Sequence, residues 1–181
     1  ERRLAAGLDP KVESVASLFV SRWDVAVKLE IPSPFHNRLG IAMAMRTYGA
    51  HRELLASERW QRLAAAGARP QRLLWASTGT KDAAAPDTLY VQALEAAGTI
   101  NTLPEKTLLA FADHGQIGTL LRADGDYADA VLEEFRREGL DDVALAERLL
   151  REGVEGFAVS WHATLSCIRE KCAPTTAATL P

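Results

Sequence analysis

The sequence predicts an α/β fold in which short parallel strands alternate with helices and a helical segment follows. Three short apolar runs, at residues 13–23, 71–77 and 99–103, are bounded by polar or turn-forming residues, as buried parallel strands are. Between and after these runs, apolar residues recur every three or four positions, which is the period of a helix. Strands joined by helical crossovers pair in parallel, so these observations together predict a parallel sheet.

Length and composition are those of an ordinary globular domain. The chain has 181 residues, of which 48% are hydrophobic and 25% are charged, enough for one domain with a sizeable core. The chain has a net charge of -3 and an isoelectric point near 5.8, whereas a nucleic-acid binder is normally basic. No apolar run approaches the roughly 20 residues that a membrane span needs. We therefore expect neither nucleic acid nor a membrane as a partner.

The first residues resemble the end of a helix, with Gly7 in the C′ position, and the chain starts at Glu1. We therefore expect this sequence to be part of a longer protein. Cys167 and Cys172 are five positions apart, which fits neither a metal site nor a redox motif, so we expect free thiols in a reducing cytoplasm. The histidines also lack metal-ligand spacing, and we expect no metal and no cofactor.

Side chains that could bind a ligand stand on and directly after the first predicted strand. Ser21 and Arg22 close it, and Ser17 interrupts its apolar face. A hydroxyl and a forked guanidinium at the exit of a buried strand suit a phosphate or sugar ligand. The alternative is that Ser17 is a small packing residue and Arg22 a solvated charge. After this strand, Pro32 and Pro34 predict that residues 24–34 are irregular.

The remaining elements follow from their boundary residues. A helical pattern begins near Phe35, and Ser57 is placed to cap a second helix that ends at Gly67. Asp87 and Gly98 frame a helix at 88–97. Thr102 and Glu105 fit a capping box for a helix that ends at Gly115. A loop is expected at 116–126, then helical stripes separated by Gly139 and Gly153, and a frayed tail at 175–181.

Polar corners follow all three predicted strands. They are Ser21-Arg22, the segment 77–81, and Asn101-Thr102. Because the carboxyl ends of parallel strands meet at one edge of the sheet, the three corners should share a rim, where ligands of such folds bind. This expectation favours the ligand-binding interpretation of Arg22.

Four motifs resemble transaldolases, most closely the actinobacterial type. They are SVASLFVSRWD at 14–24, RLLWASTGTKDAAAPDTLYV at 72–91, GTINTLPEKTLLAFADHG at 98–115 and GVEGFAVSWHATL at 153–165. The resemblance covers most of the chain. It implies the C-terminal portion of a (β/α)8 TIM barrel, followed by C-terminal helices. Residues 1–115 would carry barrel strands six to eight, and residues 116–181 would form a helical segment that packs on the barrel.

The resemblance also implies an activity. Transaldolase is a class I aldolase-type transferase of the pentose phosphate pathway. It moves a dihydroxyacetone unit, through a Schiff base, from sedoheptulose 7-phosphate to glyceraldehyde 3-phosphate. Ser17 matches a serine that binds substrate, Arg22 matches the arginine that binds the sugar phosphate, and Phe19 matches an aromatic that lines the pocket. Lys81 stands near a second phosphate-binding arginine of some members. Leu18 and Ser21 replace a proline and a glycine found in some members.

The family's Schiff-base lysine lies on the fourth barrel strand and its acid–base carboxylates on strands one and three, so this chain contains no catalytic residue. Lys11, Lys28, Lys106 and Lys171 fall in loops or on polar helix faces and are poor substitutes. We therefore expect this portion alone to be inactive. One alternative is a non-catalytic, transaldolase-like protein that binds sugar phosphates or partners and regulates rather than transfers. Another is a fusion to a further sugar-phosphate enzyme. The sequence leaves homo-oligomerisation open.

Overall fold

A computed structural model describes residues 1–121 and 126–172 of the chain. It divides into two compact units, residues 1–140 and residues 141–181. The first unit contains the sheet and most of the helices, and the second contains one long helix. The expected tail at 175–181 and part of the expected loop at 116–126 lie outside the described residues.

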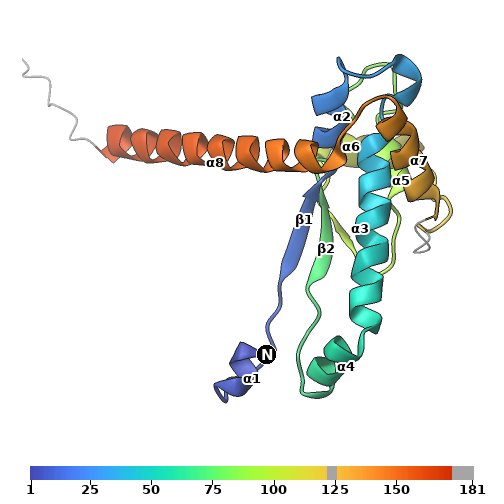
Figure 1. The fold of residues 1–181 in the computed structure, drawn as a ribbon. Helices are drawn as coiled ribbons and strands as arrows, with labels where there is room; N and C mark the ends of the chain where they lie inside the picture. Colours follow the sequence, from blue (N-terminus) through green and yellow to red (C-terminus); the bar gives the residue numbers. More distant parts are fainter. Residues whose placement is uncertain (122–125, 173–181) are drawn as a thin grey trace, which may run out of the picture. The chain divides into compact units, whose positions relative to one another are not determined.

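The sheet of the first unit has three parallel strands in the order β1-β2-β3. The strands are β1 (Val15–Phe19), β2 (Arg72–Ala76) and β3 (Ile100–Asn101). Ala16 lies opposite Leu73 and Leu18 opposite Trp75, which fixes the register of the first pair. Figure 1 shows β1 and β2 side by side. The predicted parallel α/β arrangement is thus confirmed for this part of the chain.

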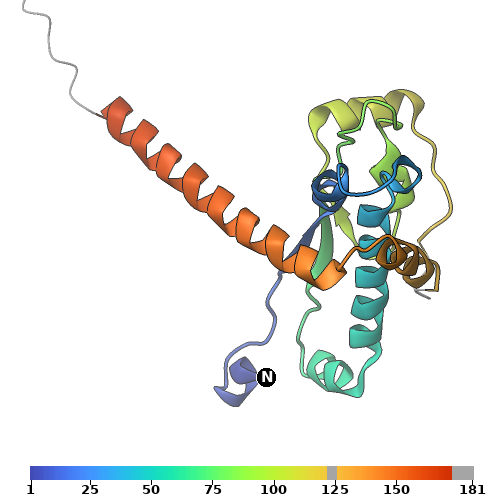
Figure 2. The ribbon, with the colours of Figure 1, turned by 45° about the horizontal axis from the view of Figure 1, so that its top comes forward.

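Helices connect the strands. Between β1 and β2 lie α2 (Val20–Val27), the 3-10 turn η1 (Ser33–Phe35), α3 (Leu39–Ala56) and α4 (Glu58–Ala65). α5 (Leu89–Ala93) joins β2 to β3, and α6 (Glu105–His114) and α7 (Asp126–Arg137) follow. The short α1 (Arg2–Ala5) precedes β1, as the opening residues predicted. Figures 1 and 2 both show α3 running alongside β1 and β2.

One face of the sheet packs on the helices. Leu73 and Trp75 of β2 contact Tyr48 of α3 and Tyr90 of α5 in a buried apolar cluster. Ala16 and Leu18 of β1 also pack against this cluster. Burial of these large side chains, with Trp75 and Tyr90 at 0% and 1% exposed, stabilises the unit.

The prediction that residues 24–34 are irregular is wrong for residues 24–27. β1 ends at Phe19, and residues 20–27 form the helix α2. Val20, Trp23 and Val27 lie on one face of this helix and are 0%, 7% and 0% exposed. Their spacing of three and four residues lets the helix bury all three side chains, which outweighs the weak preference of β-branched residues for strands.

Helix boundaries agree in part with the expected ones. Ser57 caps α4, since its Oγ accepts a hydrogen bond from the Trp60 amide. α5 is shorter than expected and its N-cap is Thr88, not Asp87. Pro104 precedes α6 without a side-chain cap, so the expected capping box is absent. The hydroxyl of Thr102 instead donates to the Trp75 carbonyl oxygen, across the sheet.

α7 belongs with the sheet. It packs on α3, the rings of Phe35 and Phe135 meet edge to face at 5.5 Å, and Arg38 pairs with Glu134 at 2.8 Å. The boundary between the compact units therefore follows α7, at 140/141, whereas the resemblance placed a division at 115/116.

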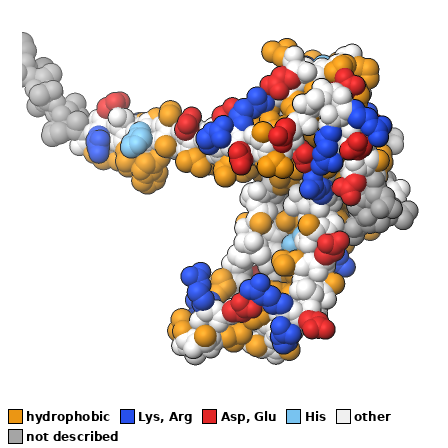
Figure 3. Space-filling view, viewed as in Figure 1, with side chains coloured by type: hydrophobic (Ala, Val, Ile, Leu, Met, Phe, Trp, Pro, Cys, Tyr) orange, Lys and Arg blue, Asp and Glu red, His pale blue; other side chains and the backbone are white. Residues whose placement is uncertain are grey.

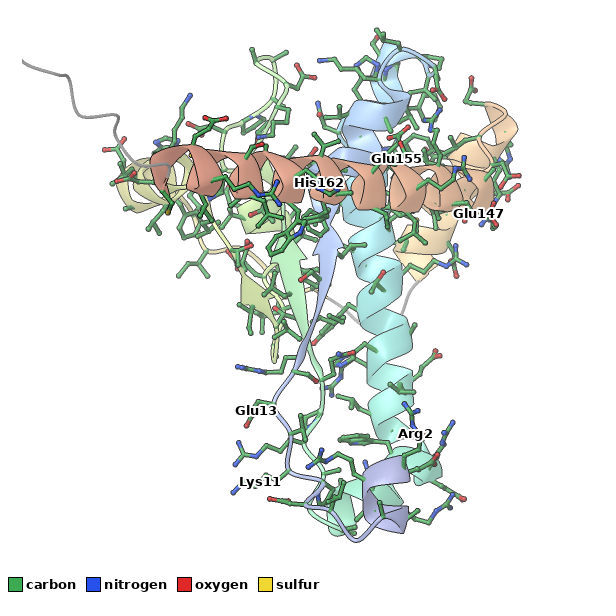
Figure 4. All side chains as sticks on the ribbon, turned by 90° about the vertical axis from the view of Figure 1, so that its left-hand side faces the viewer. Arg2, Lys11, Glu13, Glu147, Glu155 and His162 are labelled. Atoms are coloured by element: carbon green, nitrogen blue, oxygen red, sulfur yellow. The ribbon has the colours of Figure 1, made fainter. Side chains whose placement is uncertain are left out.

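The second unit consists of α8 (Asp142–Cys172). The expectation that Gly153 separates two helices is wrong. Gly153 lies inside α8, where the flanking good helix formers maintain the hydrogen-bond pattern. Cys167 and Cys172 are exposed free thiols. Glu147, Glu155 and His162 are labelled along α8 in Figure 4. Within the described residues, no helix is long and apolar enough to cross a membrane.

Ion pairs lie on and near α1 and α4. Arg59 of α4 pairs with Glu1, and Arg69 pairs with Glu13. Glu13 and Lys11 lie on the segment that leads into β1 (Figure 4). Figure 3 shows acidic and basic side chains interspersed on this end of the unit.

Candidate functional site

The carboxyl ends of the three strands are joined by hydrogen bonds into one rim. The Ser21 amide, at the start of α2, donates to the Ser77 carbonyl oxygen at the end of β2, over 3.1 Å. The hydroxyl of the buried Thr78 donates to Asn101 Oδ1 over 2.7 Å, which joins the exits of β2 and β3. The structure thus places the polar corners of all three strands along the same edge.

The corner after β2 has an unusual backbone. Ser77 has φ of +55°, in the left-handed region that residues with a side chain rarely adopt. Its carbonyl oxygen accepts the hydrogen bond that anchors α2, so the strained conformation is held by the start of that helix. Such strain is concentrated at functional sites, where the surroundings over-determine it.

Arg22 lies in the first turn of α2. This helix directly follows β1 (Figure 1). It is exposed, and its guanidinium carbon lies 5.1 Å from the centroid of the half-buried Phe19 ring. The ring holds the cation by a cation–π contact. Within residues 1–121 and 126–172, no carboxylate forms an ion pair with Arg22. The structure therefore brings Arg22 and Phe19 together as a cation available to an anion.

Ser17 lies on β1 opposite Leu74 of β2, and its side chain is exposed. Successive side chains of a strand point to opposite faces, so Ser17 and Phe19 share the face that Ala16 and Leu18 do not use. Ala16 and Leu18 pack on the helical layer. Ser17 and Phe19 thus present a hydroxyl and a ring on the open face, near the end where Arg22 lies.

Lys81 lies in a different part of the structure from Arg22. Its exposed side chain lines a cavity of about 190 Å³, together with Asp24 and Lys28 of α2 and its C-cap and Asp82 of the same loop. Arg22 does not line this cavity. The structure therefore does not place Lys81 in one pocket with Arg22 and Phe19.

The charges in this cavity are partly compensated. Asp82 accepts a hydrogen bond from Asn37 Nδ2 over 2.9 Å and pairs with Lys28 at 3.3 Å. The hydrogen bond from Asn37 is the main reason that the pKa of Asp82 is lowered to about 2. Asn37 itself has φ of +62°, so the connection before α3 is held in a second left-handed conformation. Lys81 forms no ion pair with the described residues.

Asp24 is the site residue that sequence reasoning missed. It is 6% exposed and accepts three hydrogen bonds, from the amides of Leu39 and Gly40 and from the hydroxyl of Tyr90. Burial raises its pKa to about 6, although these hydrogen bonds act in the opposite direction. Burial beside Asp24 also raises the pKa of Tyr90, so the phenol stays a donor. The one available signal was the helical spacing of its neighbours Val20, Trp23 and Val27.

The chemistry of this edge fits an anion better than a metal ion. Among the described residues, no group of histidine, cysteine, aspartate and glutamate side chains is arranged to hold a metal. All lysines of the chain are exposed, including Lys11, Lys28, Lys106 and Lys171, whereas a Schiff-base lysine must be desolvated. What the described rim offers is a stacked guanidinium, a hydroxyl and an aromatic ring.

Comparison with known proteins gives a consistent result. A sequence model of the family described as Transaldolase/Fructose-6-phosphate aldolase matches residues 2–168. The chain is 47% identical to a transaldolase of Parafrankia sp. over 180 residues, which is 94% of this chain and 49% of that protein. It is 42% identical to a transaldolase of Thermobifida fusca over 182 residues, 96% of this chain and 50% of that protein.

A transaldolase of Acidothermus cellulolyticus is 47% identical over 171 residues, 89% of this chain and 45% of that protein. The chain therefore spans about half the length of the curated relatives that it matches. The resemblance seen in the four motifs is confirmed over nearly the whole chain. The chain belongs to the transaldolase/fructose-6-phosphate aldolase family.

Proposed function

We propose that this chain is the C-terminal half of a transaldolase of the cytoplasm. In the complete protein it carries strands six to eight of a (β/α)8 barrel and supplies a wall of the sugar-phosphate site. The edge strands support this: β1 and β3 each pair with β2 alone among the described strands, so each leaves one edge for further pairing. The relatives' shared name supports the reaction, which transfers a dihydroxyacetone unit from sedoheptulose 7-phosphate to glyceraldehyde 3-phosphate.

Arg22 carries the proposal. Its guanidinium lies at the carboxyl end of the sheet, is stacked on Phe19, and has no carboxylate partner among the described residues. The planar fork matches two phosphate oxygens, and the positive end of the α2 dipole lies beside it. Ser17 contributes a hydroxyl for the sugar, and Phe19 lines the pocket. We assign Lys81 a lesser, long-range attraction to phosphate because a lysine acts as a point charge and two carboxylates line its cavity.

The chemistry itself needs groups from outside residues 1–181. The substrate carbonyl would form a Schiff base with a lysine of the other half of the protein. That lysine must be held out of water, and every lysine of this chain is exposed. The role of this half is then to bind and orient the phosphorylated end of the sugar while the reacting carbons lie against the other half.

The phosphate role is tested with Arg22→Ala in the full-length protein. Loss of a charge-assisted bidentate contact should cost about 1.5–3 kcal/mol. We expect the KM for glyceraldehyde 3-phosphate to rise roughly 10- to 150-fold and kcat to change much less. The KM for glyceraldehyde, which lacks the phosphate, should not change. Arg52→Ala, which removes an exposed arginine of α3, is the matched control. An unchanged KM for the phosphorylated acceptor would refute the role.

Catalysis is tested by trapping. With fructose 6-phosphate, the full-length protein should release glyceraldehyde 3-phosphate and keep the dihydroxyacetone unit as a Schiff base on a lysine. Borohydride should reduce this Schiff base to a stable secondary amine, and peptide mapping should place the modified lysine outside residues 1–181. Failure to form any adduct, with sugar-phosphate binding retained, would favour the non-catalytic binding protein instead. An adduct on Lys28 or Lys81 would contradict the proposed division of roles between the two halves.

A further inference from the structure

One buried carboxylate ties three helices together next to the proposed phosphate site. Asp24 Oδ1 accepts a hydrogen bond from the Leu39 amide over 2.9 Å. Asp24 Oδ2 accepts from the Gly40 amide over 3.1 Å and from the Tyr90 hydroxyl over 2.9 Å. Leu39 and Gly40 begin α3, and Tyr90 lies on α5. A single side chain of α2 therefore accepts hydrogen bonds from two amides in the first turn of α3 and connects α2 to α5.

The approach of α3 to α2 is close enough to require a glycine. A Cβ atom at position 40 would lie 2.6 Å from Asp24 Oδ2 and would also collide with the Val20 carbonyl oxygen. Any side chain at this position would push the two helices apart or displace the carboxylate. The position of α2 on α3 thus depends on both the glycine and the carboxylate.

The same short helix carries Arg22. α2 has eight residues, and Arg22 precedes Asp24 by two positions, about 200° around the helix axis. Asp24 faces the buried side, and Arg22 is exposed. The guanidinium contacts the ring of Phe19, the residue just before α2, and the backbone of Arg22 belongs to α2. Where Arg22 points is therefore set by how α2 is seated.

We propose that Asp24 is the positioning residue of the phosphate site: its ionised carboxylate seats α2 on α3 and α5 in the orientation that presents Arg22 to a sugar phosphate. The inference rests on the proposed function, since it takes Arg22 as the phosphate contact. Asp24 does not touch the substrate in this proposal, and it acts through the backbone of α2.

Asp24 changes its charge within an accessible pH range, in a setting of other charged and titratable groups. Groups with charge or a titrating proton face the cavity beside it from every neighbouring element: Lys28 at the end of α2, His36 before α3, Lys81 and Asp82 after β2, and Tyr90 on α5. Burial raises the pKa of Asp24 to about 6. A protonated carboxyl loses charge and turns one acceptor into a donor, so the three hydrogen bonds weaken as the pH falls below about 6.

The test is a double-mutant cycle in the full-length protein with Arg22→Ala, Asp24→Asn and the pair. At about pH 8, where Asp24 is ionised, we expect Asp24→Asn to raise the KM for glyceraldehyde 3-phosphate about tenfold, with kcat changed less than about threefold. The KM for glyceraldehyde should stay the same. In the Arg22→Ala background, Asp24→Asn should have no further effect on KM, because the group that it positions is gone.

The pH profile gives an independent readout. Between about pH 8 and pH 5, the KM of the wild type should rise further than that of Asp24→Asn, because only the wild type loses a carboxylate. Titration of the substrate phosphate affects both proteins equally and cancels in their ratio. Tyr90→Phe, which removes one of the three donors and keeps the ring, should give a smaller rise in KM of the same kind. It serves in place of Asp24→Asn should that variant not fold.

The outcomes separate the two claims. If Arg22→Ala leaves KM unchanged, both the phosphate role and the positioning role are refuted. If Arg22→Ala raises KM but Asp24→Asn and Tyr90→Phe do not, the positioning role alone is refuted. Additive effects of Arg22→Ala and Asp24→Asn, or an equal loss for the phosphorylated and unphosphorylated acceptors, would show Asp24 to be merely structural.

Discussion

The two faces of β1 have opposite surroundings. Ala16 and Leu18 pack on the buried cluster of β2, α3 and α5. Val15 on the other face is 42% exposed, and Ser17 beside it is exposed as well. β2 repeats the contrast in its middle, where Leu73 and Trp75 are 6% and 0% exposed and Leu74 between them is half-buried, although Ala76 at its end is 8% exposed.

This difference separates stability from ligand binding within one strand. The covered face contributes apolar burial, and substitutions there change the free energy of unfolding. The other face carries the exposed hydroxyl of Ser17 and the half-buried ring of Phe19, and it leads directly to Arg22. Substitution of the exposed Ser17 should therefore change substrate affinity and leave stability nearly unchanged.

The largest expected effect on the covered face is that of Trp75→Ala. The indole is fully buried, and removing it should lower the free energy of unfolding by about 3–5 kcal/mol, measured by urea denaturation. Trp75→Phe is the matched control and should cost much less. It fills most of the space, and the Trp75 Nε1 atom that it removes has no hydrogen-bond partner among the described residues. Equal losses in both variants would contradict the claim that the buried volume of this side chain sets the cost.

The buried carboxylate on the helical side should make stability depend on pH. Folding raises the pKa of Asp24 from 3.8 to about 6, so the folded state binds more protons between these values. The stability contribution of the protonated carboxyl is fully present below about pH 3.8 and is lost as the pH rises through 6, in total on the order of 3 kcal/mol.

Urea denaturation of the wild type and Asp24→Asn isolates this group. From about pH 4 to pH 7, the free energy of unfolding of Asp24→Asn should increase relative to that of the wild type, by at most about 1.4 kcal/mol per pH unit. Opposite contributions from Asp82, whose pKa is lowered, are common to both proteins and cancel. No relative change, or a change of opposite sign, would show that folding does not raise the pKa of this carboxyl.

The sequence predicts the sheet better than the helix that follows its first strand. β2 was recognisable because an apolar run between Pro70 and the polar corner at Ser77 has the length and boundaries of a buried strand. α2 was not, because Val20, Val25 and Val27 favour strands locally, and Pro32 and Pro34 suggested an irregular segment. The helix forms because three of its side chains reach the core, which is a tertiary effect.

The same distinction applies to the site. Arg22 could be proposed from local sequence because it directly follows a strand at the ligand-binding edge. The role of Asp24 depends on Leu39, which is 15 positions away, and on Tyr90, which is 66 positions away. No periodicity connects such distant residues, and their contact follows only from how α2, α3 and α5 pack. Ser77 was likewise expected in a polar corner, but its left-handed backbone was not.

The smallest expected effects come from two single substitutions at neighbouring positions of β1. They test the contrast between the two faces of the strand most directly. Ser17→Ala removes a hydroxyl from the open face and should raise the KM for sugar phosphates about two- to tenfold, the loss of one hydrogen bond, with the free energy of unfolding within about 0.5 kcal/mol of the wild type. Ala16→Ser places a hydroxyl on the covered face and should lower that free energy by about 1 kcal/mol without changing KM. Kinetics and urea denaturation of the two full-length variants measure both quantities. If the two substitutions gave the same pattern, the two faces of β1 would not divide stability from binding.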